Sequence, residues 1–225
     1  GELVPDAVNV KGGAIHQDIR PSLPLVEKMA QIATAIAGEL PVSMEVQVRG
    51  DIAGHDSSVL ATSALKGALI ATGAEDVTYV NTPALAEARG MTSSVNTDPE
   101  SPEYRSMISL HAALNDGRSV VVSGTLMGIR KVEKIIAIDE FDLDLAPTEN
   151  LLFLRYTDRP GIVGIVGNAL GKANINIAGM QVARDNAGGE ALMALTVDSG
   201  INTNILADLK KETGAKLVHT VNLVG

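Results

Sequence analysis

The sequence predicts a chain of the α/β (α+β) class that is divided into two domains. In its first part, apolar residues recur at helical spacing, and alternating segments typical of strands follow. Near Ala-Pro-Thr-Glu-Asn at 146–150 this pattern stops, and a regular series of shorter strands and helices begins. A length of 225 residues suits one large domain or two modest ones.

The first domain is expected at residues 16–148, behind a connector at 1–15. Its helices are predicted from apolar spacing and from cap residues, and its strands from alternation. The expected elements before residue 103 are a helix over 22–38, a strand over 42–48, a helix over 56–73, a short strand over 78–80, a helix over 82–90 and a loop over 97–102.

Strands are expected in the rest of this domain. The segments 108–114 and 119–126 flank Asn115-Asp116-Gly117, whose Asp-Gly pair is typical of a hairpin turn. A third strand is predicted over 133–138. The acids of 139–144 alternate with apolar residues, which favours an edge strand with a solvated face over a cation site.

The second domain, residues 150–225, shows a β-α-β-β-α-β order. Two βαβ halves of this kind form the ferredoxin-like arrangement, with both helices on one face of the sheet. The predicted elements are strands over 151–156, 175–183, 191–197 and 217–223, and helices over 162–173 and 201–213.

Composition excludes several classes of function. The net charge of -9 disfavours attraction to nucleic acid or to an anionic membrane. The chain has no cysteine, so disulfides, zinc-thiolate sites and thiol catalysis are excluded. No apolar run is long enough to span a bilayer. The first residues lack an initiator Met and a signal sequence, and they are interpreted as a cut inside a longer protein.

The turn at 156–161, Tyr-Thr-Asp-Arg-Pro-Gly, is the first candidate site. A helix N-terminus binds carboxylates, Gly161 lets a ligand approach the backbone, and Asp158 can pair with an ammonium group. Asn176 starts the next strand, and we expect it at the same end of the sheet as this turn. From spacing alone, a structural role is favoured, in which Asp158 caps the helix and Asn176 stabilises a turn.

Other candidates are weaker. Gly161, Gly164 and Gly167 do not match the dinucleotide fingerprint, so close helix packing is preferred to nucleotide binding. The four histidines are scattered, with no pair at i, i+4, so no metal site is expected. No serine lies in a nucleophile-elbow sequence, and no catalytic residue is assigned.

Two groups of motifs carry a family resemblance. The turn at 156–161, a helix and Asn-Ile-Asn-Ile at 174–177 resemble an ACT domain. The whole chain resembles the C-terminal half of long-type D-3-phosphoglycerate dehydrogenases, which consists of an intervening domain, also called the allosteric substrate-binding domain, and an ACT domain. The other matching motifs are Val-Pro-Asp-Ala-Val-Asn at 4–9, Leu-Pro-Val at 40–42, Val-Arg-Gly at 48–50, Tyr-Val-Asn-Thr-Pro at 79–83, Glu-Ala-Arg-Gly at 87–90 and Val-Ser-Gly-Thr-Leu at 122–126.

The resemblance implies a regulatory role. In that family the catalytic half uses NAD to oxidise 3-phosphoglycerate in the first step of L-serine synthesis, and its catalytic residues precede the segment at 4–9. This chain alone should therefore bind no NAD and have no dehydrogenase activity. Relatives bind L-serine between two ACT domains, which implies at least a dimer in the cytoplasm. The matching positions are Tyr156, Asp158, Pro160, Gly161, Ile162, Val163 and Asn176.

One departure concerns a second effector site. Some relatives carry a basic cluster near the last hairpin of the intervening domain, thought to bind a phosphate-bearing effector. Lys134 remains here as the candidate for a weak anion site, but the four acids between Asp139 and Asp144 would repel a phosphate. The resemblance favours a serine-sensing regulatory chain. The alternative is a purely structural oligomerisation module with a vestigial ligand site.

Overall fold

The computed structural model describes residues 15–223, so nearly all of the expected connector at 1–15 lies outside the described residues. The chain forms two compact units that divide between Lys134 and Ile135. This boundary comes earlier in the chain than the one expected near 148–150. Strand β6 (Phe141–Leu145) falls in the second unit, because it contacts strands β8 (Ile177–Arg184) and β9 (Glu190–Val197) there.

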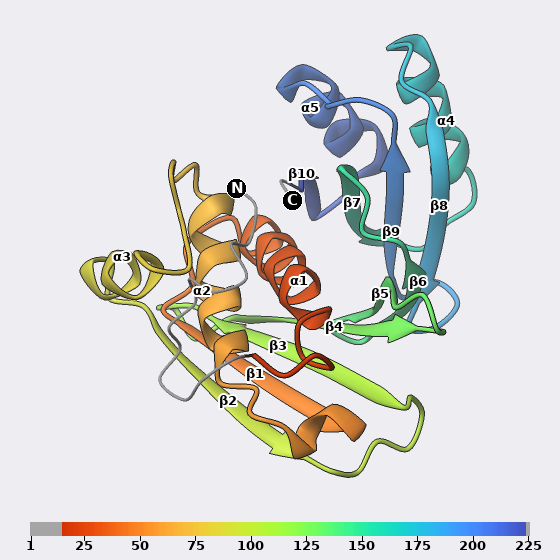
Figure 1. The fold of residues 1–225 in the computed structure, drawn as a ribbon. Helices are drawn as coiled ribbons and strands as arrows, with labels where there is room; N and C mark the ends of the chain where they lie inside the picture. The colour runs from red at the N-terminus through yellow and green to blue at the C-terminus, as the bar shows by residue number, and fades with distance from the viewer. Residues whose placement is uncertain (1–14, 224–225) are drawn as a thin grey trace. The chain divides into compact units, whose positions relative to one another are not determined.

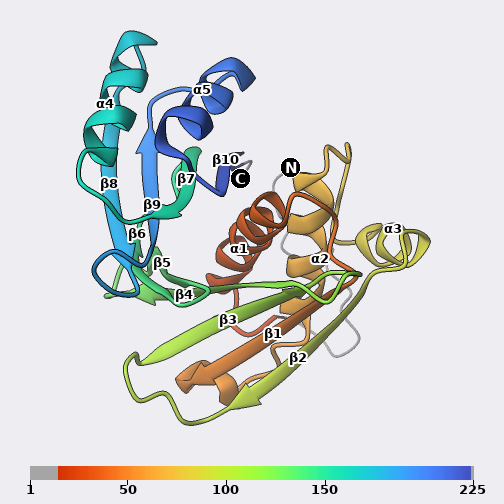
Figure 2. The same cartoon turned by 180° about the vertical axis from the view of Figure 1, so that it is seen from behind.

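The first unit places helices on one face of a sheet (Figure 1). Helix α1 (Ser22–Ala37) ends at Gly38, whose φ of 75° places it in the left-handed region. Helix α2 (Val59–Ala71) packs closely on α1, and in Figure 2 the opposite face of the sheet carries no helix. The other helical segments are η1 (Asp51–Gly54) and α3 (Thr82–Ala88).

The larger sheet has the strand order β2-β1-β3-β4-β5-β6. Strands β1 and β2 are parallel, which requires a crossover through α2 and α3. The pairs β3–β4 and β5–β6 are antiparallel. The unit boundary falls inside β5. The remaining bounds are β1 Ser43–Gly50, β2 Thr92–Asp98, β3 Ser106–Ala113, β4 Ser119–Met127 and β5 Val132–Ile138.

Two expectations for the first unit were wrong. Strand β2 was not expected, because its polar sequence shows no apolar alternation; its seven-residue register with β1 holds it in the sheet. The predicted strand over 78–80 is a turn. There the hydroxyl of Tyr79 donates a hydrogen bond to Glu27 of α1, while Val80 is 79% exposed.

The second unit confirms the predicted β-α-β-β-α-β order, and its sheet has the strand order β10-β7-β9-β8. Buried residues from β7, β9, α4 and α5 form one core, so both helices cover the same face of this sheet. The bounds are β7 Asn150–Thr157, α4 Ile162–Lys172, β8 Ile177–Arg184, β9 Glu190–Val197, α5 Thr203–Thr213 and β10 Leu217–Asn222.

Strand β6 confirms the interpretation of the acidic segment as an edge strand. It is the last strand in its sheet, with Phe141, Leu143 and Leu145 buried and the two aspartates between them exposed. The guanidinium of Arg155 in β7 lies 5.2 Å from the centre of the Phe141 ring. Because Arg155 and the core residue Tyr156 are adjacent in a strand, this contact lies on the sheet face opposite the helices.

Candidate functional site

The turn between β7 and α4 leaves the N-terminus of the helix open. Gly161 is the N-cap residue with φ 94°, a conformation that glycine adopts without strain. No side chain caps this end, so the structural role expected for Asp158 as a helix cap is not found. The first backbone N–H groups of α4, including those of Ile162 and Val163, therefore keep the partial positive charge that attracts a carboxylate.

Two hydrogen-bonded anchors, one from the backbone and one from a side chain, fix the position of this turn. The N–H of Asp158 donates to the carbonyl of Gly189 at 2.8 Å, which ties the turn to the loop before β9. The guanidinium of Arg159 donates to the carbonyls of Glu212 and Thr213 at 3.4 and 3.3 Å, at the end of α5. The turn is thus held from both sides, and the helix N-terminus is preorganised.

The side chains at the turn divide into buried and accessible groups. Tyr156 and Ile162 are only 2% and 1% exposed and belong to the core, whereas Val163 is 50% exposed. Burial, and next the negative charge of Asp158, raise the pKa of the Tyr156 hydroxyl above its usual value. The carboxylate of Asp158 accepts a hydrogen bond from Arg184 at 3.3 Å and keeps 21% of its side chain exposed.

Asn176 lies at the other end of the same sheet, which corrects the expectation that it joins the turn. Ile177 of β8 pairs with Val197, close to the start of β7, whereas Arg184 at the far end of β8 contacts Asp158. At about 3.3 Å per residue, the length of β8 separates these two points by roughly 23 Å. The amide nitrogen of Asn176 donates to Asp198 at 2.9 Å.

Two partners of the candidate residues were not predicted from the sequence: Arg184, which forms an ion pair with Asp158, and Asp198, which accepts a hydrogen bond from Asn176. Neither belongs to a local motif, since Arg184 follows Asp158 by 26 positions and Asp198 follows Asn176 by 22. The only signal in the sequence was the strand pairing itself. A β8–β9 hairpin beside β7 brings the end of β8 toward the turn that follows β7.

The helix glycines do not play the part expected of them. A Cβ at Gly164 or Gly167 would meet no other atom within 4 Å, so neither glycine permits a close helix contact within the described part of the chain. The prediction of close packing was therefore wrong. Val163, on the same helix, and Val182 of β8 are both exposed.

The candidate anion site at Lys134 lies at the end of the β4–β5 hairpin. Lys134 and Arg130 line an open hollow with Met127, Ile129 and Val132. Of the acids expected to repel a phosphate, Glu140 and Asp139 contact the guanidinium of Arg155, at 2.6 and 3.8 Å.

The histidines are less scattered than their positions in the sequence indicate. The rings of His16 and His55 stack with their centres 3.7 Å apart, although 39 positions separate them. His111 is exposed on β3, and His219 lies in β10, where burial, followed by the charge of Lys210, lowers the pKa of its imidazole. Spacing along the chain did not anticipate the first pair.

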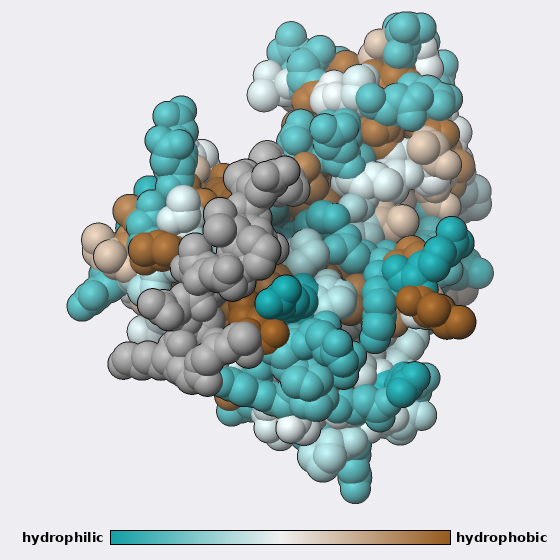
Figure 3. Space-filling model, viewed as in Figure 1, coloured by the Kyte–Doolittle hydropathy of each residue, from teal (hydrophilic) through white to brown (hydrophobic). Residues whose placement is uncertain are grey.

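Polar residues cover most of the face seen in Figure 3, and apolar residues occur there in small areas. Among the described residues, no helix is both long and apolar enough to cross a membrane.

Comparison with known proteins agrees with this architecture. A family model for the D-3-phosphoglycerate dehydrogenase intervening domain matches residues 18–139, and a model for the ACT domain matches residues 150–214. The chain is therefore of the class in which an intervening domain precedes an ACT domain. It belongs to the D-3-phosphoglycerate dehydrogenase family.

Curated relatives support the same assignment across nearly the whole chain. D-3-phosphoglycerate dehydrogenases of Mycobacterium leprae and Mycobacterium tuberculosis are 39% and 40% identical to it, each over 99% of its length. The enzyme of Synechocystis is 32% identical over 96% of the chain. The chain spans only 42% of each mycobacterial relative and 39% of the Synechocystis relative.

Proposed function

We propose that this chain is the regulatory part of an NAD-dependent D-3-phosphoglycerate dehydrogenase, the first enzyme of L-serine synthesis in the cytoplasm. In this proposal it binds L-serine between two ACT domains and carries feedback control to catalytic domains that hold NAD. The chain itself binds no NAD and performs no dehydrogenation. The observation that carries the proposal is the uncapped N-terminus of α4 beside the carboxylate of Asp158.

The charges at this turn complement those of a free amino acid. The backbone N–H groups at 161–163 offer hydrogen bonds and a partial positive charge to the ligand carboxylate. Asp158 offers a negative partner to the ammonium group. Pro160 and Gly161 leave the helix start free of a bulky side chain, so the small ligand can approach the backbone.

The remaining binding residue, Asn176, is supplied by a second chain. Strand β8 is an edge strand of its sheet, and an edge strand offers unpaired backbone N–H and C=O groups to another strand. If two copies of β8 pair antiparallel about a two-fold axis, the Arg184 end of one faces the Asn176 end of the other. Asp158 of one chain and Asn176 of its partner then enclose the ligand, although one chain keeps them apart.

Exposed apolar residues favour the same surface for self-association. Among the described residues of the second unit, the large hydrophobic side chains left exposed are Val163 and Val182, at 50% and 41%. They lie on α4 and β8, the two elements that would flank the two-fold axis. Their burial in a dimer adds hydrophobic stabilisation to the strand pairing.

Feedback control follows from linkage. A ligand held by two chains binds best to the arrangement that brings both halves of the site together, and it shifts the population toward that arrangement. The same preference changes the equilibrium of any catalytic domain coupled to these units, by as much as the ligand discriminates between the two arrangements.

Calorimetry on the chain tests the proposal. We expect L-serine to bind, and we expect Asp158→Ala and Asn176→Ala each to abolish binding, because each removes a partner of a charged or polar ligand group. The matched controls are Asp208→Ala and Asn204→Ala on the exposed side of α5, which should bind like the parent. Unchanged binding in both site variants would exclude this site.

The rival function is a purely structural oligomerisation module. It predicts the same dimers or tetramers by light scattering, but no amino acid would raise the melting temperature. The two functions therefore differ in ligand binding and agree in assembly, and serine titration with simultaneous mass measurement separates them.

A further inference from the structure

Three ligand-type side chains meet in the first unit, away from the ACT turn. The ligand atoms of His16, Asp18 and His55 all lie within 4.8 Å of one another. The carboxylate Oδ2 of Asp18 is 3.7 Å from Nδ1 of His16 and 3.7 Å from Nε2 of His55. From this geometry we propose that His16, Asp18 and His55 form a binding site for a divalent transition-metal ion of the zinc type.

The donor set suits such an ion. Two imidazoles and one carboxylate are ligands that bind Zn²⁺ and other divalent transition-metal ions. Three protein ligands leave one coordination position of a tetrahedral ion open. With bonds of about 2.0–2.1 Å, tetrahedral ligand atoms are separated by roughly 3.3 Å. The observed separations of 3.7 Å from Asp18 to each histidine approach this value, and reorientation of the two stacked rings would bring the three atoms onto one ion.

Local hydrogen bonding orients one of these ligands. The backbone N–H of Asp18 donates to Nδ1 of His16 at 3.3 Å, so this nitrogen is an unprotonated acceptor on the side of Asp18, and a bound ion would replace that hydrogen bond. The two rings are stacked with an angle of 14° between their planes, and their lone pairs must converge to share an ion. Both rings are partly exposed, at 43% and 34%, so they can rotate without disturbing the core.

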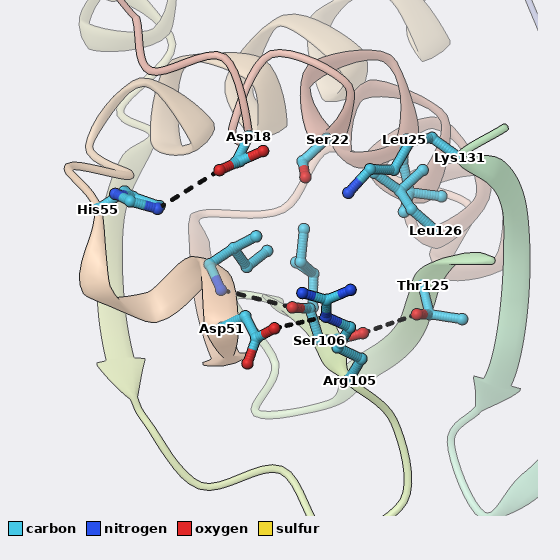
Figure 4. Close-up of a pocket in the computed structure, with 12 residues that line it drawn as sticks. Asp18, Ser22, Leu25, Asp51, His55, Arg105, Ser106, Thr125, Leu126 and Lys131 are labelled. Carbon is cyan, nitrogen blue, oxygen red and sulfur yellow. Dashed lines mark hydrogen bonds and ion pairs between the residues drawn. The ribbon is translucent and has the colours of Figure 1, made fainter. Parts of the chain in front are cut away.

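The site lies at the edge of a cavity of about 290 Å³, shown in Figure 4. Asp18 and His55 belong to its wall, and Asp51 adds a further carboxylate whose charge is offset by Arg105 at 2.5 Å. An ion held by Asp18 and His55 therefore becomes part of the cavity wall. The open coordination position is available to water or to a small anionic ligand.

The ion would connect two segments that are far apart in the sequence. His16 and Asp18 lie in the turn before α1, whereas His55 follows η1 and precedes α2. Binding fixes the start of α1 to the entry of α2 and stabilises the folded first unit, because the unfolded chain does not hold the three ligands together.

Titration of the metal-free, tag-free chain with Zn²⁺ tests the site. We expect one high-affinity ion per chain, a higher melting temperature, and visible d–d absorption when Co²⁺ is used in place of Zn²⁺. His16→Ala, Asp18→Ala and His55→Ala should each lower the affinity by at least about 10–100-fold, the loss that changes outside the ligand shell already cause.

The other two histidines of the chain are the matched controls. His111→Ala and His219→Ala should bind Zn²⁺ like the parent, since neither belongs to the cluster. The proposal is overturned if the three site variants bind like the parent, or if the control variants lose as much affinity. His16→Gln keeps the test decisive if an alanine variant does not fold, because glutamine preserves much of the volume but lacks the imidazole ligand.

Discussion

At the scale of single residues, Arg155 connects three parts of the second unit. Its guanidinium contacts Glu140 at 2.6 Å and Glu190 at 3.1 Å, and it lies over the ring of Phe141. Lys216 of the last loop approaches Glu190 at 2.6 Å from the other side. These contacts tie the β5–β6 hairpin and the start of β10 to the face of the sheet that α4 and α5 leave uncovered.

The Glu190 carboxylate makes this network sensitive to pH. The hydrogen bond from Lys216, with a smaller contribution from Arg155, holds the pKa of Glu190 below its usual 4.5. A lowered carboxyl pKa contributes stability above pH 4.5, and this stability is lost as the pH falls through the folded-state value. We expect Glu190→Gln to lower the free energy of unfolding at pH 7.

The difference between Glu190→Gln and the parent should shrink as the pH falls through the lowered folded-state pKa of Glu190, because the parent carboxylate then becomes neutral as well. Urea unfolding curves between pH 3 and pH 7 measure it. A constant difference across this range would show that packing, and not charge, accounts for the effect. Glu149→Gln, at an exposed position, is the matched control.

At the scale of elements, the packing of α1 on α2 depends on Gly67. A Cβ there would overlap the backbone carbonyl of Glu27 and lie 2.9 Å from the Cβ of Ala30. Beside this contact, Lys66 donates to Glu27 at 2.6 Å, and the Tyr79 hydroxyl lies 3.1 Å from Ser63. Burial, followed by the negative charge of Glu27, raises the pKa of Tyr79 above its usual range.

Gly67→Ala should therefore separate the two helices and destabilise the first unit by roughly 1–3 kcal/mol, the usual cost of overpacking. Gly167→Ala is the matched control, since a Cβ at Gly167 would meet no other atom within 4 Å. It should raise stability by about 1 kcal/mol through helix propensity. Thermal unfolding of both variants measures this, and equal effects of the two would refute the packing argument.

The same elements show how far sequence reasoning reaches. Helices α1 and α4 were predictable because their apolar periodicity and the glycines at their ends are local signals. Strand β2 was not predictable, because its polar residues are held by pairing with β1. The candidate turn was predictable from Asp158 and Gly161. The position of Asn176 was not, since it depends on the direction of β8 beside β7.

At the scale of the whole molecule, the central claim is that one ligand site needs two chains. Each chain carries Asp158 and Asn176, the two halves of the proposed site, at opposite ends of one sheet. In this proposal, antiparallel pairing of two β8 strands would create two sites, each built from Asp158 of one chain and Asn176 of the other. A module with an intact site inside each chain would not require any assembly to bind serine.

Co-assembly of two inactive variants tests this claim most directly. Asp158→Ala chains and Asn176→Ala chains, carrying different tags, are co-expressed, and the mixed dimer is purified through both tags. One of its two sites then has both residues intact and the other has neither. We predict that the mixed dimer binds one L-serine by calorimetry, while each variant alone binds none. A mixed dimer that binds no serine, or one variant alone that binds like the parent, would contradict a site shared between chains.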